Sequence, residues 1–167
     1  MLKIRTYPEK VLTAKAEPVR RIDKTTLALI DEMFETMYGE RGVGLAAPQV
    51  GESIRLCVVN CTGKKEDEIV LINPVIVSSS GEQVDEEGCL SVPGARAKVA
   101  RAERVTVKAF DRNGREIELE ADGLHARCIQ HELDHLNGRL FFHRLNEAAR
   151  MTINAQLKRL EDEHEEE

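Results

Sequence analysis

The segment that most constrains this chain is Gln130–His135, which reads Gln-His-Glu-Leu-Asp-His. Residues four apart lie on the same face of an α-helix, so His131 and His135 can direct ring nitrogens at one metal ion. Such a His-Glu-x-x-His helix is typical of divalent-metal hydrolases, in which the glutamate, here Glu132, takes a proton from water and does not bind the ion. The fold must therefore give this helix a dry, shaped wall.

The metal-binding helix is predicted to run from Leu124 to Leu136, with Asp122 as its N-cap and Gly138 as its terminator. Its residues fall into an apolar stripe, a face that carries the metal pattern, and a remaining polar face. The stripe is Ala126, Ile129, Leu133 and Leu136, the metal face is Leu124, Cys128, His131, Glu132 and His135, and the polar face is Arg127, Gln130, Asp134 and Asn137. A helix that is buried on two sides lies at the centre of its fold.

A catalytic site of the zinc type uses three protein ligands and one open position, so one ligand is missing from this helix. A third histidine six residues further on would extend the motif, but Phe141 stands there. The downstream carboxylates Glu147 and Glu161 belong to no ligand-helix pattern, and Cys128 lies one turn too far back. Cys89 is the remaining candidate, and its ordinary alternative is a small buried core residue.

Length and composition predict one globular domain of 167 residues with a sizeable core. Hydrophobic residues make up 41% of the chain, no apolar run approaches the ~20 residues of a membrane span, and the N-terminal segment lacks a signal-peptide pattern. We therefore expect a cytoplasmic protein whose four cysteines are free thiols or metal ligands. The net charge of −6 disfavours nonspecific nucleic-acid binding, and acid concentrates in a C-terminal tail at Glu161–Glu167.

The other elements are predicted from hydrophobic periodicity and from turn residues. Helices are expected at Asp23–Gly39 and after a cap at Asn146, the latter with Ile153, Leu157 and Leu160 facing inward. Strands are expected at Ile54–Asn60, Ile69–Val77, Arg104–Phe110 and Glu116–Glu120, with an extended segment at Gly81–Glu87.

The segment Gly42–Gln49 is too apolar for a surface loop, and Pro48 excludes a helix interior. Small residues such as Gly44 permit the backbone to approach a ligand closely. Gln49 ends the run with a polar amide that must find partners, and stabilising an oxyanion is one use for it. A turn followed by a buried strand is the alternative interpretation.

Three blocks of sequence, Gly42–Gln49, Glu87–Ser91 and Gln130–His135, together resemble the peptide deformylase family. Members of this family are hydrolases of protein biosynthesis that remove the N-formyl group from new bacterial or organellar polypeptides. The resemblance implies an α+β fold in which β-sheets enclose the central metal-binding helix, with a further helix at each end of the chain. The three motifs are complete and span nearly the whole sequence.

The resemblance also implies the residues of the site. The ligands would be Cys89, His131 and His135, with Fe²⁺ as the usual native ion; intrinsic affinity allows Zn²⁺ or Ni²⁺ to be bound after aerobic purification. Glu132 would be the general base, and the Gln49 amide with the Leu90 backbone N–H would hold the oxyanion. The peptide would lie extended near Gly44. Its methionine side chain would enter an apolar pocket formed in part by Val43, Leu124 and Cys128.

Two features depart from the commonest family pattern. Arg127 stands where many members carry an apolar residue, and we expect its guanidinium to reach solvent. The C-terminus is acidic, whereas in some members a basic C-terminal helix meets the ribosome. The expected partners are N-formylmethionyl peptides and nascent chains, with the ribosome as a candidate and without specific nucleic acid or membrane. The expected oligomeric state is a monomer.

Two other functions fit parts of the pattern. A zinc peptidase would cleave amide bonds without needing a formyl group. A catalytically inactive metal-binding module would dock on nascent chains or ribosomes. Glu132 and Gln49 favour catalysis over the second alternative, because a binding module has no use for a proton shuttle beside the metal.

Overall fold

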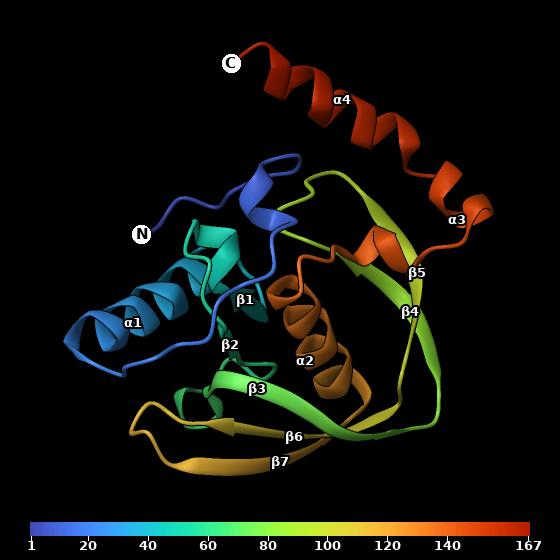
Figure 1. The fold of residues 1–167 in the computed structure, drawn as a ribbon. Coiled ribbons are helices and arrows are strands. Elements are labelled where there is room, and N and C mark those ends of the chain that lie inside the picture. The colour runs from blue at the N-terminus through green and yellow to red at the C-terminus, as the bar shows by residue number, and fades with distance from the viewer.

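Helix α2 (Gly123–Leu136) lies between two antiparallel β-sheets in a computed structural model that describes residues 1–167 (Figure 1). The larger sheet has the strand order β1-β2-β3-β6-β7, and the smaller sheet pairs β4 with β5. The strands are β1 (Gly44–Ala46), β2 (Leu56–Val59), β3 (Ile69–Ser80), β4 (Gln83–Gly88), β5 (Arg96–Arg101), β6 (Arg104–Phe110) and β7 (Glu116–Asp122). The predicted α+β architecture around a central helix is confirmed.

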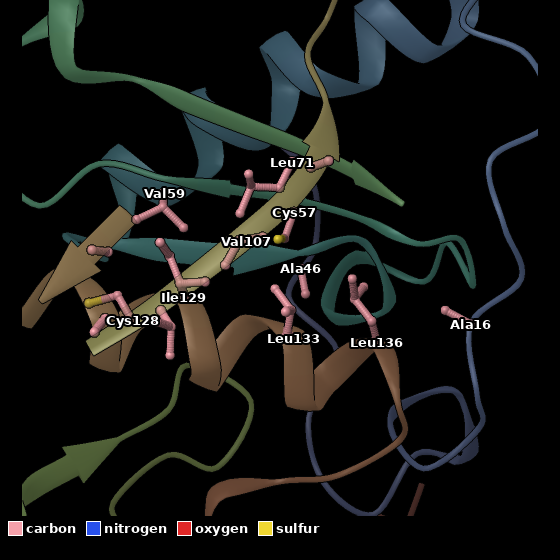
Figure 2. Packing of buried hydrophobic residues seen from close by; sticks show 14 residues of the cluster. Ala16, Ala46, Cys57, Val59, Leu71, Val107, Cys128, Ile129, Leu133 and Leu136 are labelled. Carbon is pink, nitrogen blue, oxygen red and sulfur yellow. The ribbon is translucent and has the colours of Figure 1, made fainter. Parts of the chain in front are cut away.

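The apolar stripe of α2 forms the main contact between this helix and the larger sheet. All four predicted stripe residues are buried, and they belong to one cluster with side chains of β2, β3, β6 and β7. Figure 2 shows Ile129 beside Val107 and Leu133 beside Ala46, so both side chains of α2 face the strands of the larger sheet. The apolar residues that recur every three or four positions therefore form the side of α2 that packs on the larger sheet.

Helix α1 (Lys24–Gly39) covers the opposite face of the same sheet, and the Asp23 carboxylate accepts a hydrogen bond from the Thr26 N–H at its start. Strand β2 is buried on both faces for this reason. Val58 packs in the cluster that contains α1, whereas Cys57 and Val59 pack in the cluster that contains α2. The alternation of successive side chains along a strand accounts for this division.

The C-terminal region forms two helices in place of the one predicted. Helix α3 (Glu147–Met151) is capped by Asn146, and α4 (Asn154–Glu165) follows after a break at Thr152 and Ile153. The break changes the chain direction (Figure 1). It brings Ile153 into the same buried cluster as Leu157 and Leu160, so the predicted inward residues are confirmed.

Other boundaries differ from the sequence prediction. Strand β5 was not predicted, because its inward positions are Ala97, Val99 and the charged Arg101, which give only a weak apolar alternation. Strand β3 continues to Ser80, beyond the expected end at Val77. Four short 3₁₀ helices complete the fold, at Lys10–Leu12, Ala47–Val50, Lys65–Asp67 and Phe141–Arg144. None of the helices combines the length and apolar character that a membrane crossing requires.

The acidic C-terminal segment begins inside α4, and its first residue is bonded to the body of the protein. The Tyr7 hydroxyl donates a hydrogen bond to the Glu161 carboxylate, and burial together with Glu161 raises the pKa of Tyr7 to about 12. The following residues, from Asp162 to Glu167, are exposed. Only this last part of the predicted tail is fully solvated.

We predict that Glu161→Ala lowers the free energy of unfolding by about 1 kcal/mol, because it leaves the Tyr7 hydroxyl without its acceptor. Urea unfolding of the variant measures this loss. The matched control is Glu165→Ala, which removes an exposed carboxylate of the same helix and should leave the unfolding midpoint unchanged. Equal midpoints for both variants would show that the hydrogen bond adds no stability.

Candidate metal centre

Three potential ligand atoms converge where the end of β4 meets α2. The Cys89 Sγ lies 3.4 Å from the His135 Nε2, which lies 3.3 Å from the His131 Nε2. All three atoms are within 4.8 Å of one another. Cys89 directly follows the last residue of β4, and the two histidines lie on adjacent turns of α2. The structure thus brings together the three residues that were predicted as ligands from the sequence.

These residues fit one divalent ion. Metal bonds of roughly 2.0–2.1 Å to imidazole nitrogen and about 2.3 Å to thiolate sulfur put tetrahedral ligand atoms about 3.4–3.6 Å apart, close to the observed separations. Burial lowers the pKa of His135 well below its ordinary value. His135 is therefore a neutral imidazole, which is the form that binds metal.

A buried carboxylate orients one of the histidines. The Glu87 Oε1 lies 2.8 Å from the His131 Nδ1, so the Nδ1–H can donate to Glu87 while the Nε2 faces the other ligands. Burial raises the pKa of Glu87, but hydrogen bonds from Arg101 and His131 outweigh it and hold the pKa far below the ordinary range. Glu87 ends the predicted extended segment Gly81–Glu87, and nothing in the sequence pattern predicts this role for it.

Two residues of the polar face of α2, Arg127 and Asp134, are buried against β4 and β5, which contradicts one expectation from the sequence. Arg127 is only 4% exposed and pairs with Glu87, so the prediction that its guanidinium reaches solvent was wrong. Asp134 is also buried, 2.7 Å from Arg101 and paired with Arg144. The small sheet supplies the partners of opposite charge, Glu87 and Arg101. Buried charges are stable only when they are paired and hydrogen-bonded in this way.

Glu132 lies on the metal face of α2 with a carboxylate that is largely free. Its side chain is buried, and its Oε1 has no hydrogen-bond partner in the protein. Burial raises the pKa of Glu132 to about 7, although the nearby His131 favours the charged form. Gly44 makes room for this group, because a Cβ at position 44 would lie 2.9 Å from the Glu132 Cδ. A carboxylate with an unused oxygen and such a pKa suits proton transfer.

Gln49 presents its amide nitrogen to the ligand side of the site. Its Oε1 accepts a hydrogen bond from the Ala46 N–H at 2.9 Å, which fixes the orientation of the amide. Its Nε2 donates to the Ser91 Oγ at 3.1 Å and lies 3.6 Å from the Cys89 Sγ. The backbone N–H of Leu90 makes no hydrogen bond within the protein. The unused Leu90 N–H and the Gln49 N–H that contacts the Cys89 sulfur thus both lie beside the candidate ligands.

A cavity of about 520 Å³ opens onto these groups. Its volume is in the range of small-molecule and peptide side-chain sites. The cavity wall includes Val43, Gly44, Leu124 and Cys128, which were the predicted substrate-binding residues, together with Gln49, Cys89, Leu90, His131 and Glu132. Val43 is 40% exposed and Leu124 is 57% exposed, so the cavity offers apolar surface to a ligand.

Comparison with known proteins gives consistent matches along the chain. A family model described as polypeptide deformylase matches residues 1–151. A peptide deformylase of Chromobacterium violaceum is 51% identical over 164 residues, which cover 98% of each chain. One of Halothermothrix orenii is 55% identical over 141 residues, which cover 84% of this chain and 91% of the relative.

Solved structures agree with these sequence matches. The crystal structure of a peptide deformylase from Legionella pneumophila has a TM-score of 0.92 at 48% identity and covers 100% of this chain and 99% of its own. A peptide deformylase from Plasmodium falciparum has a TM-score of 0.94 at 36% identity and covers 98% of this chain and 97% of its own.

We predict that the protein binds one Zn²⁺ per chain and that His131→Ala abolishes this binding, because two remaining ligands cannot hold the ion against water. Equilibrium dialysis with metal analysis measures the stoichiometry. The matched control is His125→Ala, which removes a histidine of the same helix that is not among the three ligands. Equal zinc content in the two variants would contradict the assignment.

Proposed function

The chain belongs to the peptide deformylase family and is therefore a metal-dependent hydrolase that removes the N-formyl group from N-formylmethionyl nascent peptides, and we propose which of its residues perform this reaction. The proposal assigns metal binding to Cys89, His131 and His135, and proton transfer to Glu132. One observation carries it: the Glu132 Oε1 is buried without a partner, on the wall of the cavity that Cys89 and His131 also line.

The ion that we propose for these ligands is Fe²⁺, with Zn²⁺ or Ni²⁺ as ions acquired during aerobic purification. A thiolate with two imidazoles suits all three, and intrinsic affinity favours zinc and nickel over iron. When bound by Cys89, His131 and His135, the ion would supply Lewis acidity toward the formyl carbonyl and the attacking water. Metal analysis of protein that has been purified without oxygen tests this assignment.

Glu132 moves the proton in two directions. It accepts a proton from the water that attacks the formyl carbon, and it then gives this proton to the amine that leaves. The C–N bond breaks, and the products are formate and a peptide with a free N-terminus. The free oxygen of Glu132 and its raised pKa support both roles.

Gln49 and Leu90 supply hydrogen bonds to the oxygen that becomes negatively charged during the attack. The Gln49 Nε2 is held on the ligand side by the bond between its Oε1 and the Ala46 N–H. The unused N–H of Leu90 is a second donor. Donors that are fixed before the reaction stabilise the transition state without reorganising.

The substrate peptide pairs with the open edge of β1. This strand is the first in the order of the larger sheet, so one of its edges has no strand beside it. An extended peptide can add to such an edge through main-chain hydrogen bonds, which give affinity that tolerates different sequences. Gly44 lies in β1, and the methionine side chain then enters the cavity beside Val43, Leu124 and Cys128.

The proposal also covers the domain organisation, the oligomeric state and the cellular location of the protein. Residues 1–167 act as one catalytic domain, as a monomer in the cytoplasm, where formylated chains emerge. The exposed acidic end of α4 would repel ribosomal RNA, so contact with the ribosome would use another surface of the protein.

We predict that Glu132→Ala retains the bound metal and loses at least ~10²-fold in kcat for formyl-Met-Ala, because proton transfer typically contributes that much. Formate release and metal content are measured on the same sample. The control is Glu118→Ala, which removes an exposed carboxylate of β7. Wild-type activity in a metal-replete Glu132→Ala variant would contradict the assignment.

Gln49 has a separate prediction, since its amide is expected to act mainly in the transition state. Gln49→Glu keeps the acceptor for the Ala46 N–H but removes the N–H donor on the ligand side. We expect kcat to fall by ~10² or more while KM changes little, as for other oxyanion donors. An increase in KM with unchanged kcat would assign Gln49 to ground-state binding.

A further inference from the structure

We propose that Arg127 is a positioning residue of the metal centre, which acts through Glu87 to hold His131 in its metal-binding orientation. The inference rests on the proposed function, because it assumes that His131 is a ligand. Arg127 contributes nothing to the ligand set itself. Its contacts nevertheless place it two hydrogen bonds from the His131 imidazole, through Glu87.

The Glu87 carboxylate accepts four hydrogen bonds, two on each oxygen. The Oε1 is 2.8 Å from both the Arg101 Nη2 and the His131 Nδ1. The Oε2 accepts from the Arg101 Nε at 2.8 Å and from the Arg127 Nη1. Arg127 is therefore the only group other than Arg101 that fixes the oxygen opposite His131.

Neutralising the charge of Glu87 does not require Arg127. Arg101 already binds both oxygens of Glu87, and a bidentate arginine is a complete partner for a carboxylate. Asp134 in turn has a second partner in Arg144, which lies at the surface, so the whole network holds three arginines for two carboxylates. Arg127 instead helps to fix the orientation of the Glu87 carboxylate. It donates a hydrogen bond to the Oε2, and this keeps the Oε1 directed at His131.

Arg127 is itself held at a second point. Its Nε donates to the Gln83 Oε1 at 3.2 Å, and its Nη2 is 3.4 Å from the Gln83 backbone oxygen. The Gln83 Nε2 is in turn bonded to the backbone oxygens of Gly123 and Ala102, at 2.8 and 3.2 Å. The guanidinium is thus fixed before any ligand binds.

These contacts join the two elements that carry the ligands. Arg127 and the histidines lie on α2, while Gln83 and Glu87 lie near the two ends of β4, which leads directly to Cys89. Arg127 contacts β4 at both places, so it also sets how that strand lies along the helix. A shift of β4 would move the thiolate relative to the imidazoles.

Glu87 has particular weight in this site because only one of the two imidazoles has a hydrogen-bond partner in the protein on its second ring nitrogen. The His135 Nδ1 is buried and makes no hydrogen bond to any protein group. A ligating histidine usually donates its second N–H to such a partner, and loss of the partner typically lowers metal affinity about 10–100-fold. His131 alone has this support, through Glu87.

The test measures Zn²⁺ affinity without substrate, by competition with a chromophoric chelator. We expect Arg127→Met to weaken Zn²⁺ binding about 10-fold or more, and Arg127→Lys to recover only part of the loss because one ammonium cannot bond Gln83 and Glu87 as a fork does. The matched control is Arg112→Met, which removes an exposed pair with Asp31 and should bind Zn²⁺ like the wild type.

A double-mutant cycle with Glu87→Gln tests whether Arg127 acts through Glu87. In the Glu87→Gln background, Arg127→Met should weaken Zn²⁺ binding by less than about 2-fold, because the carboxylate it positions is already gone. Fully additive losses would overturn the proposal, as would wild-type Zn²⁺ affinity in folded Arg127→Met with a change only in KM. Because Arg127 also lines the cavity, the latter result would assign it to substrate binding and not to positioning of the metal centre.

Two outcomes separate this inference from the proposed function. If the wild type binds no Zn²⁺, the metal site itself fails, and with it the proposed function. If Arg127→Met does not fold, Gln83→Leu serves in its place, because it releases the guanidinium without deleting it. Weaker Zn²⁺ binding by Gln83→Leu supports the positioning role, and unchanged binding overturns it.

Discussion

The pairing of two buried carboxylates with arginines is the interaction on which the rest of the structure depends. Glu87 and Asp134 are both largely excluded from solvent, and an unpaired charge in such a place costs several kcal/mol. Arg101 bonds both carboxylates, so strand β5 joins strand β4 to helix α2 at this point. The small sheet therefore packs on α2 through charges, while the large sheet packs on it through an apolar stripe.

This division explains where the metal centre lies. The apolar side of α2 fixes the helix against the larger sheet, and the charged side draws β4 alongside, so that Cys89 meets His131 and His135. Gly44 lies on the edge strand β1, and its backbone packs directly beside the Glu132 side chain. Helix α2 thus carries two of the proposed ligands and the proposed base, while Cys89 follows β4 and Gln49 lies in the 3₁₀ helix Ala47–Val50, so the site is assembled from several elements before a substrate binds.

The local features of this arrangement could be predicted from the sequence, and the long-range ones could not. Helix α2 and its paired histidines follow from spacing within one helix, and Cys89 was found by exclusion and by resemblance. The burial of Arg127 was missed because its partner Glu87 is 40 residues away in the chain. Strand β5 was missed because a buried arginine interrupts its apolar alternation. A charge that is buried by a distant partner looks like a surface charge in the sequence.

The measurement that tests this account most directly compares hydrolysis of formyl-Met-Ala and acetyl-Met-Ala by the same preparation, before and after removal of the metal with a chelator. The account predicts that formate is released from the formyl peptide only when the metal is present, and that the acetyl peptide and the Met-Ala bond stay intact. Cleavage of the Met-Ala bond would instead identify a peptidase. Release of formate at an unchanged rate after complete metal removal would contradict the central role given to Cys89, His131 and His135.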